Sequence, residues 1–251
     1  MEASFLSGEL ALAAHLAQPA RAAAGPRPAL VLSHGFPAGP GGAATSAQTY
    51  PDLAEHLAAE TGWTVLAFNF RGAGTSEGEF SLQGWLDDLD AAVQHVLSLQ
   101  RVSGVWLAGS SAGGALAVCA AAADDRVRGV ATLAAPAEFD TWANDPRGLL
   151  RQCRQIGVIH TAAFPPDVEA WAKEFKEIQP LGAVAQVPPR PLLVMHGSED
   201  TTVPVSDARA LVDAAEGEAD LRVITGAGHR LRHDPRAVAA LIGWMERQEV
   251  G

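Results

Sequence analysis

The feature that most constrains this chain is the sequence Val-Trp-Leu-Ala-Gly-Ser-Ser-Ala-Gly-Gly at residues 105–114, which continues into an alanine-rich segment ending at Ala123. An apolar run, a Gly-x-Ser-x-Gly turn and a helix-forming segment follow one another without a gap. This order predicts a strand, a tight turn that carries Ser111, and a helix. A Ser on such a turn is strained towards positive φ, so the residues two places before and after it must be small, and both are glycine. The alternative is an ordinary strand-to-helix turn with two incidental serines.

Strand and helix patterns alternate along the rest of the chain. Short apolar runs predict strands and amphipathic segments predict helices. The strands are expected at residues 29–33, 63–70, 129–133, 192–195 and 221–224, an edge strand at 9–15 before a connection at 18–28, and helices at 50–59, 82–99 and 237–248. This alternation is typical of the α/β class, so we expect a mostly parallel central sheet flanked by helices on both faces. A length of 251 residues fits one such domain as well as two small ones, and we expect a single domain, residues 1–251.

One segment, residues 136–188, interrupts this alternation. It contains helical patches and no convincing strand, together with the aromatic residues Trp142, Phe164 and Trp171. So long a connection within a compact domain is unusual and often forms a lid or a binding element. We therefore expect a short helical insertion, a cap or lid, before the strand at 192–195. Ordinary surface helices that cross from one strand to the next are the alternative.

A Ser hydroxyl becomes a good nucleophile only when a base takes its proton and a third group orients that base. Downstream of Ser111, Asp200 follows the predicted strand at 192–195, and His229 follows the one at 221–224. The carboxyl ends of parallel strands meet at one edge of a sheet, where loops gather to form sites. Ser111, Asp200 and His229 are therefore candidates for one catalytic site. Glu199 competes with Asp200 for the role of the acid.

Reaction at an acyl carbon builds negative charge on the carbonyl oxygen, and preorganised N–H donors must stabilise that charge. One candidate is the backbone N–H of Ala112, which follows Ser111 at the start of the predicted helix. The second is the N–H of Phe36, in the loop after the strand at 29–33, because Pro37 has no N–H. These two groups form the predicted oxyanion hole.

Several other polar residues are interpreted as structural. His34 and His196 each follow a predicted strand and precede a glycine, so we expect them to brace their loops. Arg71 begins a glycine-rich stretch that completes no phosphate-loop motif, so we expect a tight turn in which Arg71 pairs with a carboxylate. His233 stands four residues after His229, but the acidic partner of a His-Glu-x-x-His motif is absent. We interpret His233 as a surface residue and expect no metal site.

Composition excludes several classes of partner. The formal net charge of −11, from 18 basic and 29 acidic residues without a basic cluster, argues against nucleic acid. The two cysteines make no disulfide framework, and Cys119 is expected to be a small buried thiol. No Lys or Arg precedes Arg21, so a secretory n-region is missing, and the apolar runs are too short to cross a bilayer. We expect a cytoplasmic protein without a membrane span; the oligomeric state is left open.

Taken together, these residues resemble the α/β-hydrolase superfamily over nearly the whole chain. The stretches at 34–36 (His-Gly-Phe) and 69–78 (Asn-Phe-Arg-Gly-Ala-Gly-Thr-Ser-Glu-Gly) look like small bacterial serine hydrolases of the dienelactone-hydrolase-like and serine-aminopeptidase-like groups. The resemblance implies a sheet of about eight strands and no cofactor. By motif position, it implies Ser111 as nucleophile, Asp200 as acid, His229 as base, and Phe36 and Ala112 as the oxyanion hole. True dienelactone hydrolases use Cys where this chain has Ser111, and the Asp nucleophile of haloalkane dehalogenases is also absent.

The expected function is a cofactor-independent serine hydrolase of carboxylic esters, acting on small to medium acyl groups through an acyl-enzyme on Ser111. Trp142, Phe164 and Trp171 would supply an apolar substrate pocket. Hydrolysis of amides, thioesters or C–C bonds, or perhydrolysis, on the same three residues is the alternative. A non-catalytic binding protein with this fold is a third possibility. The resemblance specifies the machinery and leaves the small-molecule substrate open.

Overall fold

The central sheet is built from strands that bury apolar side chains on both faces. The computed structural model describes residues 1–19, 25–45 and 48–248, so the predicted connection at 18–28 lies partly outside the described residues. Within these residues, eight strands form one sheet in the order β1-β2-β4-β3-β5-β6-β7-β8. Strand β2 is antiparallel to both β1 and β4, and all other neighbours are parallel. The strands are β1 (Glu2–Ser7), β2 (Leu10–Ala17), β3 (Arg27–Ser33), β4 (Thr64–Phe68), β5 (Val102–Ser110), β6 (Val127–Leu133), β7 (Leu192–Gly197) and β8 (Asp220–Ile224).

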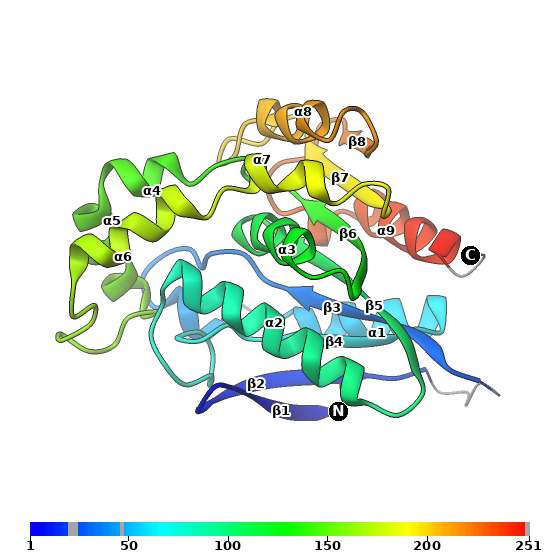
Figure 1. The fold of residues 1–251 in the computed structure, drawn as a ribbon, viewed down its shortest axis with the longest axis horizontal. Helices are drawn as coiled ribbons and strands as arrows, with labels where there is room; N and C mark the ends of the chain where they lie inside the picture. The colour runs from blue at the N-terminus through cyan, green and yellow to red at the C-terminus, as the bar shows by residue number, and fades with distance from the viewer. Residues whose placement is uncertain (20–24, 46–47, 249–251) are drawn as a thin grey trace.

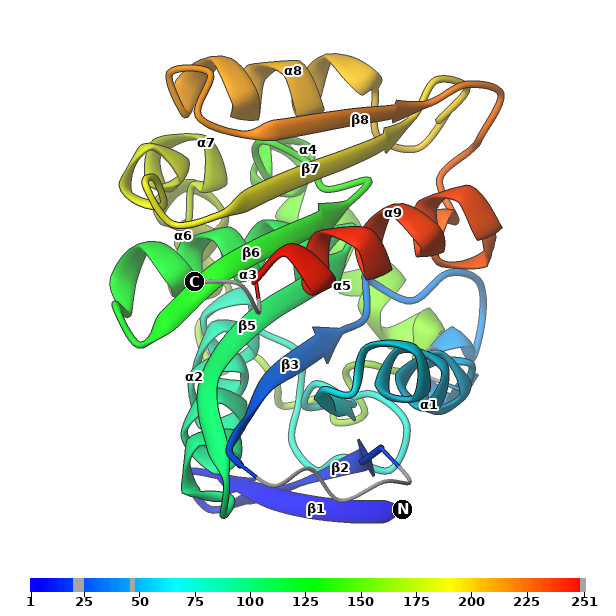
Figure 2. The same cartoon turned by 90° about the vertical axis from the view of Figure 1, so that its right-hand side faces the viewer.

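Helices cover both faces of this sheet (Figure 1 and Figure 2). Along β3, Leu30 and Leu32 belong to the apolar cluster under α1 and α9, whereas Ala29 and Val31 belong to the cluster under α2, α3 and α8. Successive strand residues point to opposite faces, so a central strand such as β3 contributes to both clusters. The predicted mostly parallel sheet between two helical layers is confirmed. The covering helices are α1 (Tyr50–Thr61), α2 (Leu82–Ser98), α3 (Ala112–Ala123), α8 (Val205–Ala214) and α9 (Pro235–Arg247).

The residues between β6 and β7, all of them described, form short helices and no strand. Figure 1 shows α4, α5 and α6 together at the left of the view, to one side of the sheet. The N–H of Ala137 donates to Asp207 Oδ2 on α8 (3.1 Å), and the N–H of Leu181 donates to the carbonyl of Ala137 (3.0 Å). These bonds hold the beginning and the end of the segment together at its base. The elements are α4 (Asp140–Asn144), α5 (Pro146–Ile156), α6 (Val168–Glu177), α7 (Pro180–Ala183) and a 3₁₀ turn, η2 (Val184–Gln186).

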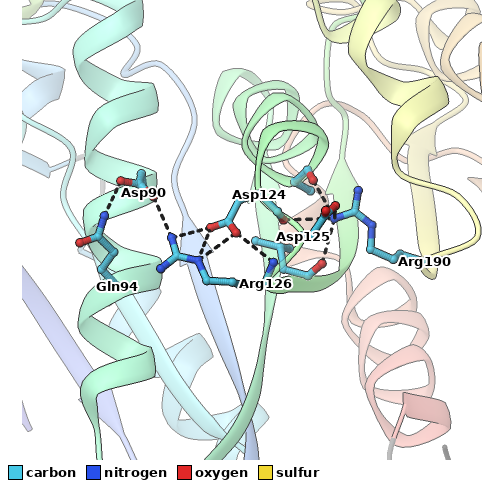
Figure 3. A network of polar contacts seen from close by, with 8 residues as sticks. Asp90, Gln94, Asp124, Asp125, Arg126 and Arg190 are labelled. Atoms are coloured by element: carbon cyan, nitrogen blue, oxygen red, sulfur yellow. Dashed lines mark hydrogen bonds and ion pairs between the residues drawn. The ribbon is translucent and has the colours of Figure 1, made fainter.

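A polar network joins α2, α3 and the residues before β7 near the amino end of β6 (Figure 3). Arg126 pairs with Asp124 (2.8 Å), which follows α3, and with Asp90 (3.3 Å) on α2. Arg190 donates to the carbonyls of Ala121 (2.7 Å) and Asp124 (3.1 Å). The last carbonyls of a helix have no partner within the helix, so Arg190 satisfies groups that would otherwise need water.

A buried ion pair holds the turn after β4. Arg71 donates to Asp88 Oδ1 through Nη2 (2.7 Å) and Nε (3.0 Å), and its backbone N–H donates to Oδ2 (2.8 Å). The Asp88 side chain is 0% exposed and that of Arg71 is 17% exposed. Trp85 Nε1 donates to the Arg71 carbonyl (3.1 Å), so α2 and the turn are connected twice. The predicted pairing of Arg71 with a carboxylate is confirmed.

We expect Arg71→Met to lower the free energy of unfolding by about 3–5 kcal/mol, because it leaves a buried carboxylate without its charged partner. Arg126→Met is the matched control, since Arg126 is 50% exposed and exposed ion pairs contribute about 1 kcal/mol or less. Urea unfolding followed by circular dichroism measures both changes. Equal losses in the two variants would contradict the structural importance of the buried pair.

Candidate active site

Ser111 lies on the tight turn between β5 and α3, in a backbone region that favours glycine. Its φ is 51° and its ψ is −126°. Its N–H donates to the carbonyl of Leu133 on β6 (2.8 Å), which fixes the turn to the neighbouring strand. A Cβ on Gly109 would lie 2.5 Å from the carbonyl carbon of Gly113, so only glycine lets the strand and the helix approach this closely. The predicted strained turn is confirmed.

The loop after β3 approaches the same turn. A Cβ on Gly35 would lie 2.8 Å from Ser111 Cβ, so Gly35 is required for this approach. The backbone N–H groups of Phe36 and Ala112 donate no hydrogen bond within the described residues. Ala112 is the first residue of α3, where the helix dipole favours negative charge. Among the described residues, neither N–H group therefore has a partner that would compete with a bound ligand.

The carboxylate of Asp200 is buried and contacts His229. Its Oδ2 accepts from His229 Nδ1 (2.8 Å), and its Oδ1 accepts from the N–H groups of Thr202 (2.8 Å) and Val203 (2.9 Å). The side chain of Asp200 is 0% exposed and that of His229 is 25% exposed. Burial raises the pKa of Asp200, but the hydrogen bonds from Val203, His229 and Thr202 outweigh it and hold the pKa below its usual value. An ionised Asp200 keeps the proton of neutral His229 on Nδ1, which leaves Nε2 as an acceptor.

Close contacts between the loops after β7 and β8 bring this pair together. The N–H of Glu199 donates to the carbonyl of Ala227 (2.9 Å). A Cβ on Gly197 would clash with the same carbonyl, so glycine permits the approach. Among the described residues, the exposed side chain of Glu199 makes no hydrogen bond or ion pair. Asp200, and not the competing Glu199, contacts His229.

Ser111 and His229 line one cavity of about 350 Å³. Within the described residues, no hydrogen bond joins the Ser111 hydroxyl to His229. In ligand-free sites such contacts are often long and shorten only when substrate binds. The rest of the lining comes from the loop after β3, the residues around the start of α1, and the 3₁₀ turn η3 (Leu231–His233).

His34 braces the loop after β3, as predicted. Its Nδ1 donates to the carbonyl of Gly35 (2.8 Å), and its Nε2 accepts from the N–H of Phe70 after β4 (3.1 Å). Burial lowers the pKa of His34 to about 4, against the raising effect of the Gly35 bond and together with the charge of Arg232. His34 is therefore neutral near pH 7 and connects two loops at the site.

His196 also braces a loop, and it contacts the candidate acid as well. Its Nε2 lies 2.9 Å from the carbonyl of Val203 and 3.3 Å from Asp200 Oδ2, and its side chain is 0% exposed. The role of His196 in its loop was predicted from the sequence, whereas its contact with Asp200 was not. The four-residue interval between them was the only available signal.

The three aromatic residues of the segment at 136–188 lie outside the lining of the cavity at Ser111. The ring of Trp142 lies 4.9 Å from that of Phe36, which does line it. Trp171 is 2% exposed, and its Nε1 donates to the carbonyl of Phe80 (3.2 Å). Phe164 is half-buried against the core. Trp142 therefore contacts a residue that lines the cavity, Phe36. Trp171 is buried in the interior of the segment.

Neither cysteine is a reactive thiol. Cys119 and Cys153 are free and buried, and burial raises the pKa of each thiol to about 12. Across residues 1–19, 25–45 and 48–248, no group of three or more His, Cys, Asp or Glu side chains is arranged to hold a metal ion. In the same part of the chain, none of the helices combines the length and apolar character that crossing a membrane requires.

We expect Gly35→Ala to slow the reaction of Ser111 with a fluorophosphonate probe by about 100-fold, because a displacement of about 1 Å at a reacting group can cost this much. The control is Gly243→Ala on α9, where a Cβ meets nothing closer than 3.8 Å. Labelling is followed by mass spectrometry. Unchanged labelling in Gly35→Ala would show that the contact between Gly35 and Ser111 does not position the serine.

The lowered pKa of Asp200 predicts a pH-dependent contribution to stability. Wild type should be more stable than Asp200→Asn above the usual Asp pKa of about 3.9, and this advantage should shrink as the pH falls through the lower pKa of the folded state. Urea unfolding of both proteins between about pH 2 and pH 6 measures the difference. A difference that does not change over this range would contradict the ionised, hydrogen-bonded state of Asp200.

Several solved structures superpose on nearly the whole chain. No curated protein sequence matches the chain significantly. Est1E from Butyrivibrio proteoclasticus superposes with a TM-score of 0.76 at 19% identity, covering 100% of this chain and 99% of that chain. The esterase Pf2001 from Pyrococcus furiosus superposes with a TM-score of 0.71 at 19% identity, covering 98% and 91%. The CarC enzyme, a serine hydrolase involved in carbazole degradation, has a TM-score of 0.68 at 16% identity and covers 98% and 99%. At these identities the likeness shows a shared fold.

The model of the alpha/beta hydrolase fold family matches residues 28–155, just over half of the chain. The match extends from β3 to α5 and includes the turn at Ser111. The resemblance to the superfamily is thereby confirmed, whereas the dienelactone-hydrolase-like and serine-aminopeptidase-like groups stay a prediction. The chain belongs to the alpha/beta hydrolase fold family.

Proposed function

We propose that this alpha/beta hydrolase is a cofactor-independent serine hydrolase that cleaves carboxylic esters with small to medium acyl groups. The observation that carries the proposal is the position of His229, which is hydrogen-bonded to the buried Asp200 at 2.8 Å and lines one cavity with Ser111. An oriented imidazole beside a hydroxyl is the arrangement that activates a serine. Among the similar structures, Pf2001 is named an esterase and CarC a serine hydrolase, and one structure of Est1E contains ferulic acid.

In the proposed reaction, Ser111 Oγ attacks the ester carbonyl while His229 Nε2 takes its proton. The imidazolium is stabilised by Asp200, which stays ionised because its own pKa is lowered. His229 then gives the proton to the leaving alcohol, and an acyl-enzyme remains on Ser111. Water hydrolyses this ester by the same route, and the serine is regenerated.

The negative oxygen of the tetrahedral intermediate would be stabilised by the N–H groups of Phe36 and Ala112, which have no partner within the described residues. Such preorganised donors act where charge develops and contribute about 3–4 kcal/mol each. The approach of Gly35 to Ser111 brings the two N–H groups to the same turn. The oxyanion hole therefore depends on the same glycine as the nucleophile.

We also propose that the segment at 136–188 acts as a cap over the acyl part of the substrate. The ring of Trp142 contacts Phe36 at 4.9 Å, and Phe36 lines the cavity. Trp171 supports this contact from behind through Phe175, whose ring lies 4.8 Å from Trp171 and 5.9 Å from Trp142. Phe164, which also belongs to the segment, packs against the apolar core.

Variants of the three residues test the mechanism on p-nitrophenyl acetate and butyrate. We expect Ser111→Ala and His229→Ala to lower kcat by about 10⁶-fold, and Asp200→Asn by about 10⁴-fold, as in a comparable triad. Ser110→Ala removes the neighbouring hydroxyl and should leave fluorophosphonate labelling of Ser111 intact. The proposal would be overturned if wild type hydrolysed the esters no faster than Ser111→Ala. It would also be overturned if His229→Ala were labelled at Ser111 as fast as wild type.

A substrate panel distinguishes the ester reaction from its alternatives. We expect p-nitrophenyl esters to be hydrolysed faster than aminoacyl arylamides, because an amine is a poorer leaving group than a phenol. Acyl-CoA thioesters form the third arm, and kcat/KM is compared across all three. If the arylamide or the thioester had the highest kcat/KM, the proposal of Ser111 as nucleophile would stand, but the proposal of an ester substrate would be wrong.

A further inference from the structure

The cavity at Ser111 is lined on one side by basic residues, although the chain as a whole carries a net charge of −11. Arg230, Arg232 and His233 follow His229 directly and line the cavity with it. Among the described residues, no Asp or Glu belongs to this lining. A positive cavity in an acidic protein indicates recognition of an anionic group, because charges of one sign in a cleft concentrate ligands of the other.

Arg232 is held in place at the cavity. Its guanidinium lies 5.2 Å from the centre of the Tyr50 ring, and its Nε donates to Thr49 Oγ1 (3.3 Å). Both Tyr50 and Thr49 also line the cavity. A guanidinium stacked on a ring keeps most of its N–H donors free for a carboxylate or phosphate.

The two arginines of the cavity have no carboxylate partner. Among the described residues, neither Arg230 nor Arg232 forms an ion pair, whereas nearby Arg236 pairs with Asp234 at 2.6 Å. Asp52 and Arg232 line a neighbouring hollow without pairing. The charge of Arg230 and Arg232 is therefore available to a ligand.

The pKa of His233 agrees with this placement. Burial lowers the pKa of His233, and the charges of Arg232 and Arg230 lower it further. The same positive charge that makes protonation of His233 unfavourable would stabilise an anion in the cavity. The lowered pKa of His233 is therefore consistent with a positive electrostatic potential in the cavity, which arises from Arg230 and Arg232.

The position of the basic residues assigns the anion to one part of the ester. In the proposed reaction His229 returns its proton to the leaving oxygen, so the leaving alcohol lies beside His229. Residues 230–233 follow His229 without a gap and line the cavity with it. We propose that the substrate is an ester whose leaving alcohol carries an anionic oxygen group, a carboxylate in the simplest case, bound by Arg230 and Arg232. This inference rests on the proposed function.

The test compares 4-acetoxybenzoate, whose leaving group carries a carboxylate, with the neutral 4-acetoxybenzamide. The ratio of their kcat/KM values is measured for each variant, so that differences in intrinsic ester reactivity cancel. We expect Arg230→Gln and Arg232→Gln each to lower the ratio by about 10- to 100-fold, the effect of losing a hydrogen bond to a charged group. Arg232→Lys should recover part of the loss, because lysine keeps the charge but loses the two-pronged geometry.

The matched control is Arg209→Gln. Arg209 is an exposed residue of α8 that lies outside the cavity lining, and its replacement changes the net charge equally. This variant should leave the ratio at the wild-type value. Raising the ionic strength to ~0.5 M should lower the wild-type ratio, because salt screens exposed charges. A ratio that is unchanged in both cavity variants, or that falls equally in Arg209→Gln, would overturn the proposal.

Two further arms keep this inference separate from the proposed function. Binding of 4-acetoxybenzoate to Ser111→Ala, measured by calorimetry, should weaken about tenfold or more when Arg232→Gln is added. If wild type hydrolyses neither ester and Ser111 is not labelled, the proposed function fails, and the calorimetry still decides the anion site. If the neutral ester is hydrolysed and the ratio is insensitive to both arginines, only the anion site fails. Monophenyl terephthalate carries its carboxylate on the acyl part, and phenyl benzoate is its neutral counterpart. If the arginine variants lower the kcat/KM ratio of this pair more than that of the acetoxy pair, the anion lies on the acyl part and the assignment is overturned.

Discussion

The approach of the loop after β3 to the turn at Ser111 is the constraint on which the site depends. Gly35 lies so close to Ser111 that a Cβ there would come within 2.8 Å of the serine Cβ. Gly35 and Phe36 of this loop line the cavity together with Ser111. A positive φ at Ser111 and a glycine at Gly109 are needed for the strand and the helix to meet there. Strain at this turn is offset by the buried sheet on either side of it.

The position of His229 depends on the charge of Asp200. Two backbone N–H groups and two imidazoles surround the carboxylate of Asp200, which is 0% exposed. A buried carboxylate is costly unless its oxygens are hydrogen-bonded, and here each oxygen has partners. The loops after β7 and β8 bring these partners together through backbone contacts that leave room only for glycine at Gly197. The positions of Ser111 and of the Asp200–His229 pair therefore both depend on a glycine that permits close approach of two loops, Gly35 in one case and Gly197 in the other.

Local patterns predicted most of the fold and the candidate site, because buried strands and strand-end loops leave clear signals in the sequence. The elements that were not predicted are those whose own residues carry a weak pattern and whose structure depends on contacts with other elements. Strand β1 (Glu2–Ser7) was not predicted, because its two apolar residues, Phe5 and Leu6, are adjacent and do not alternate with polar ones. Leu6 is 66% exposed, and pairing with β2 determines the structure of this strand. Helix α8 buries only Ala208 and Leu211. The aromatic residues at 136–188 were visible in the sequence, but only packing distinguishes the buried Trp171 from Trp142 beside Phe36.

The two buried thiols have a practical consequence. Burial raises the pKa of both thiols to about 12, so little thiolate, the species that alkylating reagents attack, is present at neutral pH. In the native protein, Cys119 on α3 and Cys153 on α5 should therefore not react with maleimides. A single cysteine introduced on the surface of α4 or α6 could then carry a fluorophore at a defined position. Such a fluorophore would test whether the segment at 136–188 changes position when a ligand binds, in a chain that needs no prior removal of its own cysteines.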